Sequence, residues 1–552
     1  MSDTRAPSER VDVCVVGAGV AGALVAYSLA ERGHDVVVLE AGERFDLDEQ
    51  REIYEQLEQA IRPEVSRAEL WGMREPRDSY TTDLDDGLYF RLNEQRTKAV
   101  GGATLHWAGY TPRLHEKDFE MQSRYGLASD WPISYEDLRP YYAQAERELG
   151  VAGAGGDPYG PPREEPFPMD PFPQSYTDRL FTEACAELGI ETHPIPQARN
   201  STSHDGRSAC LNYGTCVPFC PSGAKYDGRV HVRKAEAAGA RIVDRVPAQS
   251  IEHDESGDRV EAVRYATPDG TVHRQEARHV VLACGGIETP RLLLLSDSEQ
   301  YPDGLANSSG AVGRYFHVGL SVSTRAELDR PAQQEPVGFA TRHSTHFYDH
   351  DDPTPGSVLL TFRNENPPSP VRNALGSTDV ASGLLPEVVG DTWGDELLEE
   401  IREVAGSSHR GVRVTSSVDQ LPTASNRIEL DPSRTDDLGN PVPKVTFSVG
   451  ERARRTMERG LEIHREIFEE LGAEIVDEGT PGEGGLGNHH KGTTRMGTDP
   501  AESVVNAQCR THDLDNCWIA SASVFTTGGA MNPTLTIAAL ALRTADAIDD
   551  RL

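Results

Sequence analysis

Lysine is the scarcest charged residue in this sequence, with six lysines in 552 residues beside 48 arginines. The 54 basic residues stand against 89 Asp and Glu residues, which leaves a formal net charge of −35. A surface of that sign repels nucleic acids and anionic membranes, so a nucleic-acid-binding function is excluded. Excess acid with almost no lysine resembles the proteins of salt-in halophiles, and we expect a halophilic protein. An ordinary acidic protein is the alternative.

Long apolar runs are also missing. No stretch of 18 or more apolar residues occurs, so no helix is expected to span a bilayer. The first ten residues, MSDTRAPSER, hold neither the apolar core of a secretory signal nor a twin-arginine pair. We therefore expect a cytoplasmic protein. Eight cysteines are too few for a disulfide scaffold in a chain of this length.

A nucleotide-binding motif lies near the start of the chain. Residues 11–42 read VDVCVVGAGVAGALVAYSLAERGHDVVVLEAG, in which the first apolar run ends in Gly17, Gly19 and Gly22. Such glycines permit a tight turn and a close approach of the backbone to a pyrophosphate at a helix N-terminus. A second apolar run ends in Glu40, 18 residues after Gly22, where a carboxylate can accept hydrogen bonds from ribose hydroxyls. Together these features predict a dinucleotide site.

The order of the following segments favours FAD over NAD. A second glycine turn occupies residues 98–107, KAVGGATLHW. Residues 259–284 then have the pattern of a β-meander, with a Pro-Asp-Gly turn at 268–270. A dinucleotide motif within the first 40 residues, followed by Glu-Ala-Gly, is itself more typical of FAD-binding folds.

These segments, together with a C-terminal run, resemble the glucose–methanol–choline (GMC) family of flavoprotein oxidoreductases over nearly the whole chain. The motifs that carry the resemblance, besides the first glycines and Glu40, are VGGATLHW (100–107), GGIETPRLL (285–293), NHHKGTTRMGTDP (488–500), SVVNAQCRTHDLDNCWIASASVF (503–525) and MNPTLTIAALALR (531–543). Within the family the sequence is most similar to the flavoprotein subunits of gluconate, sorbitol, fructose and glucose dehydrogenases. Many family oxidases have Asp-Gly-Ser where this chain has Ser521-Ala-Ser523, and the dehydrogenase branch varies at that place.

The resemblance implies a mixed α+β and α/β fold, in which a Rossmann-like FAD-binding domain is interleaved with an antiparallel-sheet substrate domain. The FAD-binding domain is expected at residues 8–50, 95–115, 230–325 and 485–552. The substrate domain is expected at residues 116–229 and 326–484.

The resemblance also implies roles for residues at the reactive face of the flavin. His489, three residues before Gly492-Thr493, is expected to act as a base, and Asn532 to hold the substrate oxygen. A histidine can take a hydroxyl proton, and an amide can stabilise the developing alkoxide. A metal pair or a surface doublet is the alternative for His489 and His490, although no acidic or Cys partner stands nearby at ligand spacing. The residues expected against FAD are Gly17, Gly19, Gly22, Glu40, Gly101, Gly102, His106, Val246, Ser521, Ala522, Asn532, Pro533 and Thr534.

His106 has two interpretations. In some GMC relatives a histidine in a Gly-Gly-x-x-x-His-Trp loop is bonded covalently to the flavin 8α-methyl group, and the loop around His106 resembles it. Relatives with non-covalent FAD carry the same loop, so a histidine packed beneath the flavin ring is the alternative.

Three cysteines form a second candidate cofactor site. Cys210, Cys216 and Cys220 lie in the loop 206–228, GRSACLNYGTCVPFCPSGAKYDG, as C-x5-C-x3-C-P. Such a loop resembles those that hold iron–sulfur clusters, and the related sugar dehydrogenase flavoproteins carry a motif of this kind. Three thiolates suit a [3Fe–4S] cluster, or a four-iron cluster with one other ligand. A zinc site lacking a fourth ligand, a disulfide with one free thiol, and bystander cysteines are the alternatives.

We therefore predict an FAD-dependent dehydrogenase that oxidises a CH–OH group of a sugar, sugar acid or polyol. Hydride passes to flavin N5, and electrons leave through the cluster to a quinone, cytochrome or other carrier. The family resemblance adds a small accessory subunit as a partner, and one with a twin-arginine signal would export the chain or hold it at a membrane. The alternatives are an O2-reducing oxidase of the same fold, a dehydrogenase of a non-sugar alcohol, and a non-redox or electron-transfer role.

Overall fold

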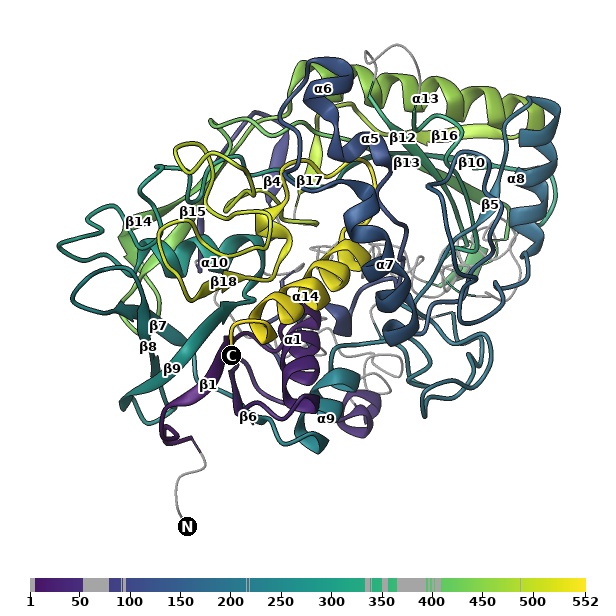
Figure 1. The fold of residues 1–552 in the computed structure, drawn as a ribbon. Coiled ribbons are helices and arrows are strands. Elements are labelled where there is room, and N and C mark those ends of the chain that lie inside the picture. Colours follow the sequence, from purple (N-terminus) through teal and green to yellow (C-terminus); the bar gives the residue numbers. More distant parts are fainter. Residues whose placement is uncertain are drawn as a thin grey trace.

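The computed structural model describes most of the chain. The described residues are 5–52, 79–90, 92, 96–214, 216–217, 219–332, 338, 340–349, 356–364, 394–395, 398–399, 402, 409–486 and 488–552. They form two large sheets, and the helices lie mainly around these sheets (Figure 1).

The N-terminal motif folds into a strand, a tight turn, a helix and a second strand. Strands β1 (Val11–Val16) and β2 (Val36–Leu39) are apolar and almost entirely buried, as expected for strands covered on both faces. They pair in parallel. Helix α1 (Val20–Glu31) is apolar nearly all round because it packs between the sheet and two further helices, α9 (Arg229–Ala237) and α14 (Thr534–Asp549).

Seven strands form the dinucleotide sheet, in the order β6–β2–β1–β9–β8–β7, with β18 also paired to β9. Strand β9 (Val272–Leu282) joins the two parts of this sheet. Its first half pairs antiparallel with β8, and its second half pairs in parallel with β1 and β18. The predicted β-meander is thereby confirmed. The other strands are β6 (Arg241–Val243), β7 (Ala248–His253), β8 (Val260–Ala266) and β18 (Cys517–Ile519).

The second large sheet is antiparallel, in the order β16–β10–β13–β12–β11–β5. In its strand β13 (Gly411–Val418), fully buried side chains alternate with half-buried ones, so one face packs on a core. Helices α13 (Glu451–Leu471) and α8 (Tyr176–Glu187) cover that sheet (Figure 1). The other strands are β5 (His193–Pro194), β10 (Leu320–Glu327), β11 (Arg342–Ser344), β12 (Val358–Arg363) and β16 (Glu474–Glu478).

Smaller elements complete the fold. One small sheet has the order β14–β15–β3, and β17 pairs with β4. The strands are β3 (Thr81–Leu84), β4 (Leu88–Phe90), β14 (Arg427–Thr435), β15 (Pro441–Phe447) and β17 (Gly484–Leu486), and the remaining helices are η1 (Gly102–Leu105), α5 (Glu116–Phe119), α6 (Met121–Tyr125), α7 (Tyr135–Leu149), α10 (Gly285–Leu294) and η2 (Ala522–Val524).

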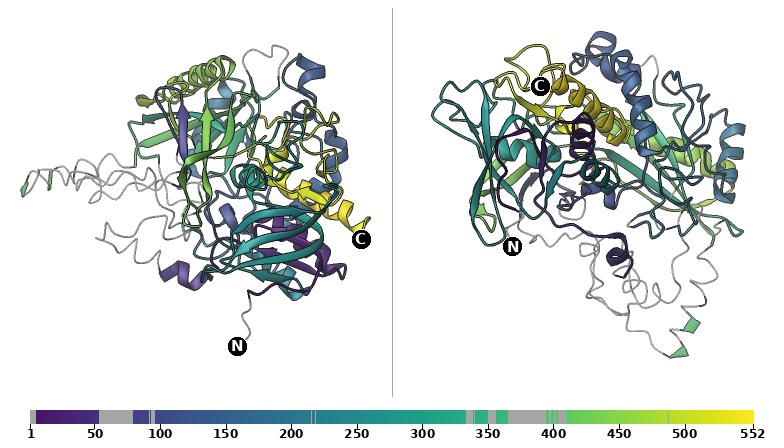
Figure 2. Two further views of the ribbon diagram at one scale, coloured as in Figure 1. Left: turned by 90° about the vertical axis from the view of Figure 1, so that its left-hand side faces the viewer. Right: turned by 60° about the horizontal axis from the view of Figure 1, so that its bottom comes forward.

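Two separate hydrophobic cores correspond to the two large sheets, which confirms the predicted mixture of a Rossmann-like part and an antiparallel part. Figure 2 shows α13 at the end of the molecule away from the dinucleotide sheet.

Helix α7 packs on α14 in the core of the dinucleotide sheet, although its sequence lies in the range predicted for the substrate domain. The domain ranges stay predictions, and residues 365–393 of the second domain lie outside the described residues. No helix within the described ranges is long and apolar enough to cross a membrane.

Candidate active site

Two glycine turns meet at the carboxyl end of β1. Gly17 has a φ of +102°, and a Cβ atom at Gly22 would lie 2.0 Å from the Gly17 carbonyl oxygen, so a side chain fits at neither position. Gly19 precedes α1 as its N-cap. In the second turn, Gly101 has a φ of +107° and Gly102 a φ of +58°. A Cβ atom at Gly102 would approach Gly19 Cα to 3.0 Å, so the two turns pack directly on each other.

Glu40 lies at the end of β2, beside the first turn. Its carboxylate accepts hydrogen bonds from the backbone N–H groups of Ala18 (2.7 Å) and Gly42 (2.9 Å). Burial raises the pKa of Glu40 to about 7, against the lowering effect of these two donors. The buried Val246 donates its backbone N–H to the Glu40 carbonyl oxygen (2.8 Å), which fixes the end of the strand.

A cavity of about 1040 Å³ opens between the glycine turns and the antiparallel sheet. Its volume lies near the upper end of the ~300–1,000 Å³ range of small-molecule sites and suits a dinucleotide. Three of the predicted cofactor residues, Gly22, Gly101 and Val246, lie behind the wall. The predicted residues that line the cavity are Gly17, Gly19, Glu40, Gly102, His106, His489, Ser521, Ala522, Asn532, Pro533 and Thr534.

His489 and Asn532 meet on the cavity wall. The Asn532 side-chain N–H donates to His489 Nε2 across 3.2 Å, so this nitrogen carries the lone pair of a neutral imidazole. Burial, with the nearby Lys491 charge, lowers the pKa of His489 to about 3. The imidazole is therefore neutral at ordinary pH and can accept a proton.

The backbone at His489 is left-handed, with φ +58°. His490 also lines the cavity, and its ring packs 5.8 Å from the ring of Phe90 and 6.0 Å from that of Phe316. Neither His489 nor His490 belongs to a group of metal-ligating side chains in the described residues. The structure therefore does not favour the metal-pair alternative.

The sequence did not predict several residues in and near the cavity. Lys491, two residues after His489, is buried and does not line the cavity, and burial lowers its pKa to about 8 against the opposing charges of Asp118 and Asp419. Arg413, Thr415 and Ser417 line the cavity from alternate positions of β13, opposite the face that packs on the core. The two-residue alternation of side chains in that strand could have predicted these three residues. No sequence pattern predicts Lys491, because segments distant in the sequence create its environment.

His106 ends the short helix η1 and lies on the cavity wall with 9% of its surface exposed. This position is compatible with both the covalent and the packed interpretation.

The cysteine loop lies close to the same cavity. Its residue Val217 lines the wall, as does Trp107. The buried Lys225 amine donates to the carbonyl oxygens of Trp107 (2.6 Å) and Cys216 (2.7 Å), and so ties the cysteine loop to the loop around His106. All eight cysteines are free thiols, so the disulfide alternative is not realised in the structure.

Arg199 is a buried charged residue in contact with the cysteine loop. It is 1% exposed, and its Nη1 donates to Cys216 Sγ across 3.4 Å. Its guanidinium lies 3.6 Å from the centre of the Phe172 ring, and its Nε and Nη2 atoms have no hydrogen-bond partner. No carboxylate pairs with Arg199 among the described residues. A buried cation in this state calls for an anionic group beside it, which fits a thiolate-held iron–sulfur cluster.

The three thiols do not converge on one point as ligands of a single small ion would. Within the described ranges, a single group of His, Cys, Asp or Glu has its ligand atoms within 4.8 Å of one another, and it contains no cysteine. A zinc site at Cys210, Cys216 and Cys220 is therefore not favoured, whereas the ligands of a cluster bind different irons and stand farther apart.

Comparisons with known proteins assign the fold and the family. Two family models described as GMC oxidoreductase match residues 15–320 and 422–541. The fructose dehydrogenase large subunit of Gluconobacter japonicus is 35% identical over 97% of both chains. The 2-methyl-1,2-propanediol dehydrogenase of Mycolicibacterium austroafricanum is 32% identical over 99% of this chain and 96% of its own.

Among solved structures, that of formate oxidase superposes with a TM-score of 0.66, at 14% identity, over 99% of both chains. The fold predicted from the sequence is thereby confirmed. One family model matches more than half of the chain. The chain therefore belongs to the GMC oxidoreductases, and it is an FAD-dependent enzyme acting on alcohol-type donors.

Proposed function

We propose that this enzyme oxidises a CH–OH group of a sugar, sugar acid or polyol by hydride transfer to flavin N5, and that the electrons leave through an iron–sulfur cluster to a carrier other than oxygen. The observation that carries the first part is the pairing of a neutral His489 with Asn532 on the cavity wall.

The residues of the chain divide the chemistry between them. His489 Nε2 accepts the hydroxyl proton as the substrate C–H bond breaks and its electron pair leaves as hydride, so that the alcohol becomes a carbonyl. The Asn532 amide donates a hydrogen bond to the substrate oxygen as negative charge develops on it. FAD, when bound, supplies the two-electron acceptor. The glycine turns and Glu40 would hold it, and His106 would either form a covalent link to it or pack against it.

The cysteine loop supports the second part of the proposal. Cys210, Cys216 and Cys220 would hold the cluster, and Arg199 and Lys225 would balance its negative charge. An iron–sulfur cluster, when bound, passes electrons singly. Because Val217 of the same loop lines the flavin cavity, the cluster would lie beside the flavin. The alternative, an oxidase that reduces O2, would need no such loop.

The acceptor and a small accessory subunit are proposed partners. One relative is named as a large subunit, which implies that it works with others. A quinone or cytochrome acceptor matches the one-electron chemistry of the cluster.

The substrate class rests on the polar face of the antiparallel sheet. Arg363 of β12 and Arg413 and Thr415 of β13 line the cavity, and such side chains hydrogen-bond to a substrate with several hydroxyl or carboxylate groups. The relative that acts on fructose supports a sugar, whereas the relative that acts on 2-methyl-1,2-propanediol supports the alternative of a non-sugar alcohol.

Anaerobic reduction of the bound flavin tests this proposal. We expect loss of the 450-nm flavin absorbance with at least one sugar, sugar acid or polyol, and much slower loss with monohydric alcohols. The same protein mixed with air should reoxidise slowly and yield little H2O2. Rapid reoxidation by O2 would instead support the oxidase alternative, and reduction by simple alcohols alone would contradict the substrate class.

We also propose that the protein is halophilic, and this predicts a strong effect of salt on stability. The chain carries a net charge of −35, and the Debye length falls from about 10 Å at 0.1 M to about 3 Å at 1 M salt. We expect the melting temperature to rise steadily from 0.1 to 3 M KCl, and bound FAD to be released on dialysis to low salt. A melting temperature that stays constant over this range would show that the chain is an ordinary acidic protein and not a halophilic one.

A further inference from the structure

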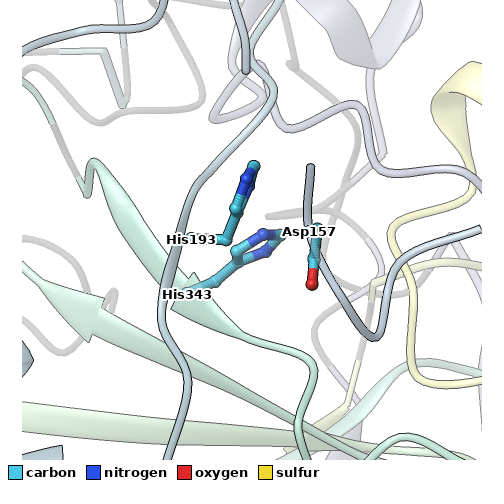
Figure 3. A group of neighbouring side chains, drawn as sticks. All are labelled: Asp157, His193 and His343. Carbon is cyan, nitrogen blue, oxygen red and sulfur yellow. The ribbon is translucent and has the colours of Figure 1, made fainter. Parts of the chain in front are cut away.

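Three potential metal ligands converge at the edge of the antiparallel sheet. Asp157, His193 and His343 come from separate segments, and their ligand atoms all lie within 4.8 Å of one another. Asp157 belongs to the loop after α7, and the two histidines belong to β5 and β11 (Figure 3). In the part of the chain that the structure describes, this is the single group of its kind.

Backbone pairing fixes the two histidines. His193 and His343 are direct partners in the antiparallel pair of β5 and β11. Side chains in such a pair stand on the same face of the sheet, with Cβ atoms about 4.5–5.5 Å apart. This arrangement follows from strand register and does not depend on any contact between the imidazoles.

The loop holds Asp157 in place from the other side. Thr345 Oγ1 lies 3.0 and 2.9 Å from the two carboxylate oxygens and donates to the carboxylate. The Tyr159 backbone N–H donates to the same carboxylate (3.1 Å). His193 Nε2 lies 3.3 Å from the Gly155 carbonyl oxygen, which can only accept, so Nδ1 carries the lone pair in that tautomer. Outer partners of this type orient the ligands of metal sites.

The three side chains do not bind each other. No hydrogen bond or ion pair joins Asp157, His193 and His343 among the described residues. A bound ion would explain why two imidazoles and a carboxylate converge without bonding to one another.

We propose that Asp157, His193 and His343 bind a divalent transition-metal ion, with Zn2+ the best fit. Two imidazoles and one carboxylate are a ligand set that suits zinc, and three protein ligands leave a fourth position for water or another ligand. Metal–ligand bonds of about 2.0–2.2 Å require the ligand atoms to be closer together than 4.8 Å. Since 4.8 Å is the upper limit on these separations, ion binding requires only small shifts of the side chains.

The site continues the sheet face that lines the substrate cavity. His343 is the direct partner of Thr361 in β12, and Thr361 is the partner of Thr415 in β13. Both threonines line the cavity. Neighbouring strands are about 4.8 Å apart, so the ion would lie one strand beyond the cavity wall. It would fasten the loop that carries Asp157 to this wall.

Equilibrium dialysis of the holoenzyme against Zn2+ tests the site. We expect the wild type to bind one Zn2+ per chain that is lost, or weakened by at least ~100-fold, in Asp157→Asn and in His193→Ala, since even outer partners contribute about 10–100-fold. Thr345→Val keeps all three ligands and should weaken Zn2+ binding by roughly 10-fold or more. His273→Ala removes a histidine from the other large sheet, and Cys216→Ser removes a thiol from the cysteine loop; both should retain the site.

Thermal unfolding gives a second measurement. Zn2+ should raise the melting temperature of the wild type and of His273→Ala, but not that of Asp157→Asn, because only a ligand bound to the native state stabilises it. Equal Zn2+ affinity in the wild type, Asp157→Asn and His193→Ala would overturn the proposal. So would a wild type that binds no stoichiometric Zn2+. Neither measurement depends on flavin reduction, so failure here leaves the proposed function standing.

Discussion

His489→Ala should retain bound FAD and lose flavin reduction by ~10²–10⁴-fold, the contribution of a positioned acid–base group. The variant removes the imidazole that accepts the hydroxyl proton and leaves Asn532 without its partner across 3.2 Å. Rapid mixing with substrate in the absence of oxygen, followed at 450 nm, measures the rate. His512→Ala serves as a control because His512 lies in the same C-terminal run but does not line the cavity.

The pH dependence of that rate provides an independent check. A base with its pKa lowered to about 3 is already deprotonated throughout pH 5–8. The wild-type rate of flavin reduction should therefore change little over this range and decrease only in stronger acid. A rate that falls with a midpoint near pH 6.5 would contradict a buried neutral His489, and a wild-type rate in His489→Ala would remove the residue from the mechanism.

Cys216→Ser should abolish iron binding and electron delivery to a quinone or cytochrome, while flavin reduction by substrate stays close to the wild-type rate. The sulfur of Cys216 is the one that Arg199 contacts, and the Cys216 carbonyl accepts from Lys225, which reaches the His106 loop. Anaerobically prepared wild type should contain about three irons per chain and give a cluster EPR signal, as three thiolate ligands suit a [3Fe–4S] cluster.

A matched variant at a cysteine outside the loop controls for general effects of removing a thiol. Cys185→Ala removes a buried thiol from α8, outside the loop, and should retain both iron and turnover. Stoichiometric zinc in place of iron, or no metal after anaerobic reconstitution, would contradict the proposed electron transfer through an iron–sulfur cluster. Iron retained at full occupancy in Cys216→Ser would show that this cysteine is not a ligand.

The sequence predicted best those parts of the site that short-range rules determine. The first glycine turn and Glu40 lie within 30 residues of each other, and strand, turn and helix patterns place them without reference to the rest of the chain. His489 and Asn532 were found through family motifs, and their contact depends on a left-handed backbone at His489 that no pattern indicates.

Residues whose environment comes from distant segments could not be found in this way. Arg199 acquires its role only when Phe172 and Cys216 pack around it, and Lys491 only when Asp118 and Asp419 lie nearby. The pairing of His193 with His343 joins strands 150 residues apart in sequence. Such contacts are fixed by the overall topology rather than by local periodicity.

Strand β9 has a consequence for how the enzyme is made. Its second half requires β1, near residue 11, on one side and β18, near residue 517, on the other. At about 5–20 residues per second, a ribosome needs roughly 25 to 100 seconds to translate the segment between them. During that interval the apolar strands β1 and β2 lack the complete sheet that buries them in the native fold. The cavity cannot yet close around its cofactor. We therefore expect FAD to be acquired after translation ends, and the nascent chain to depend on chaperones until then.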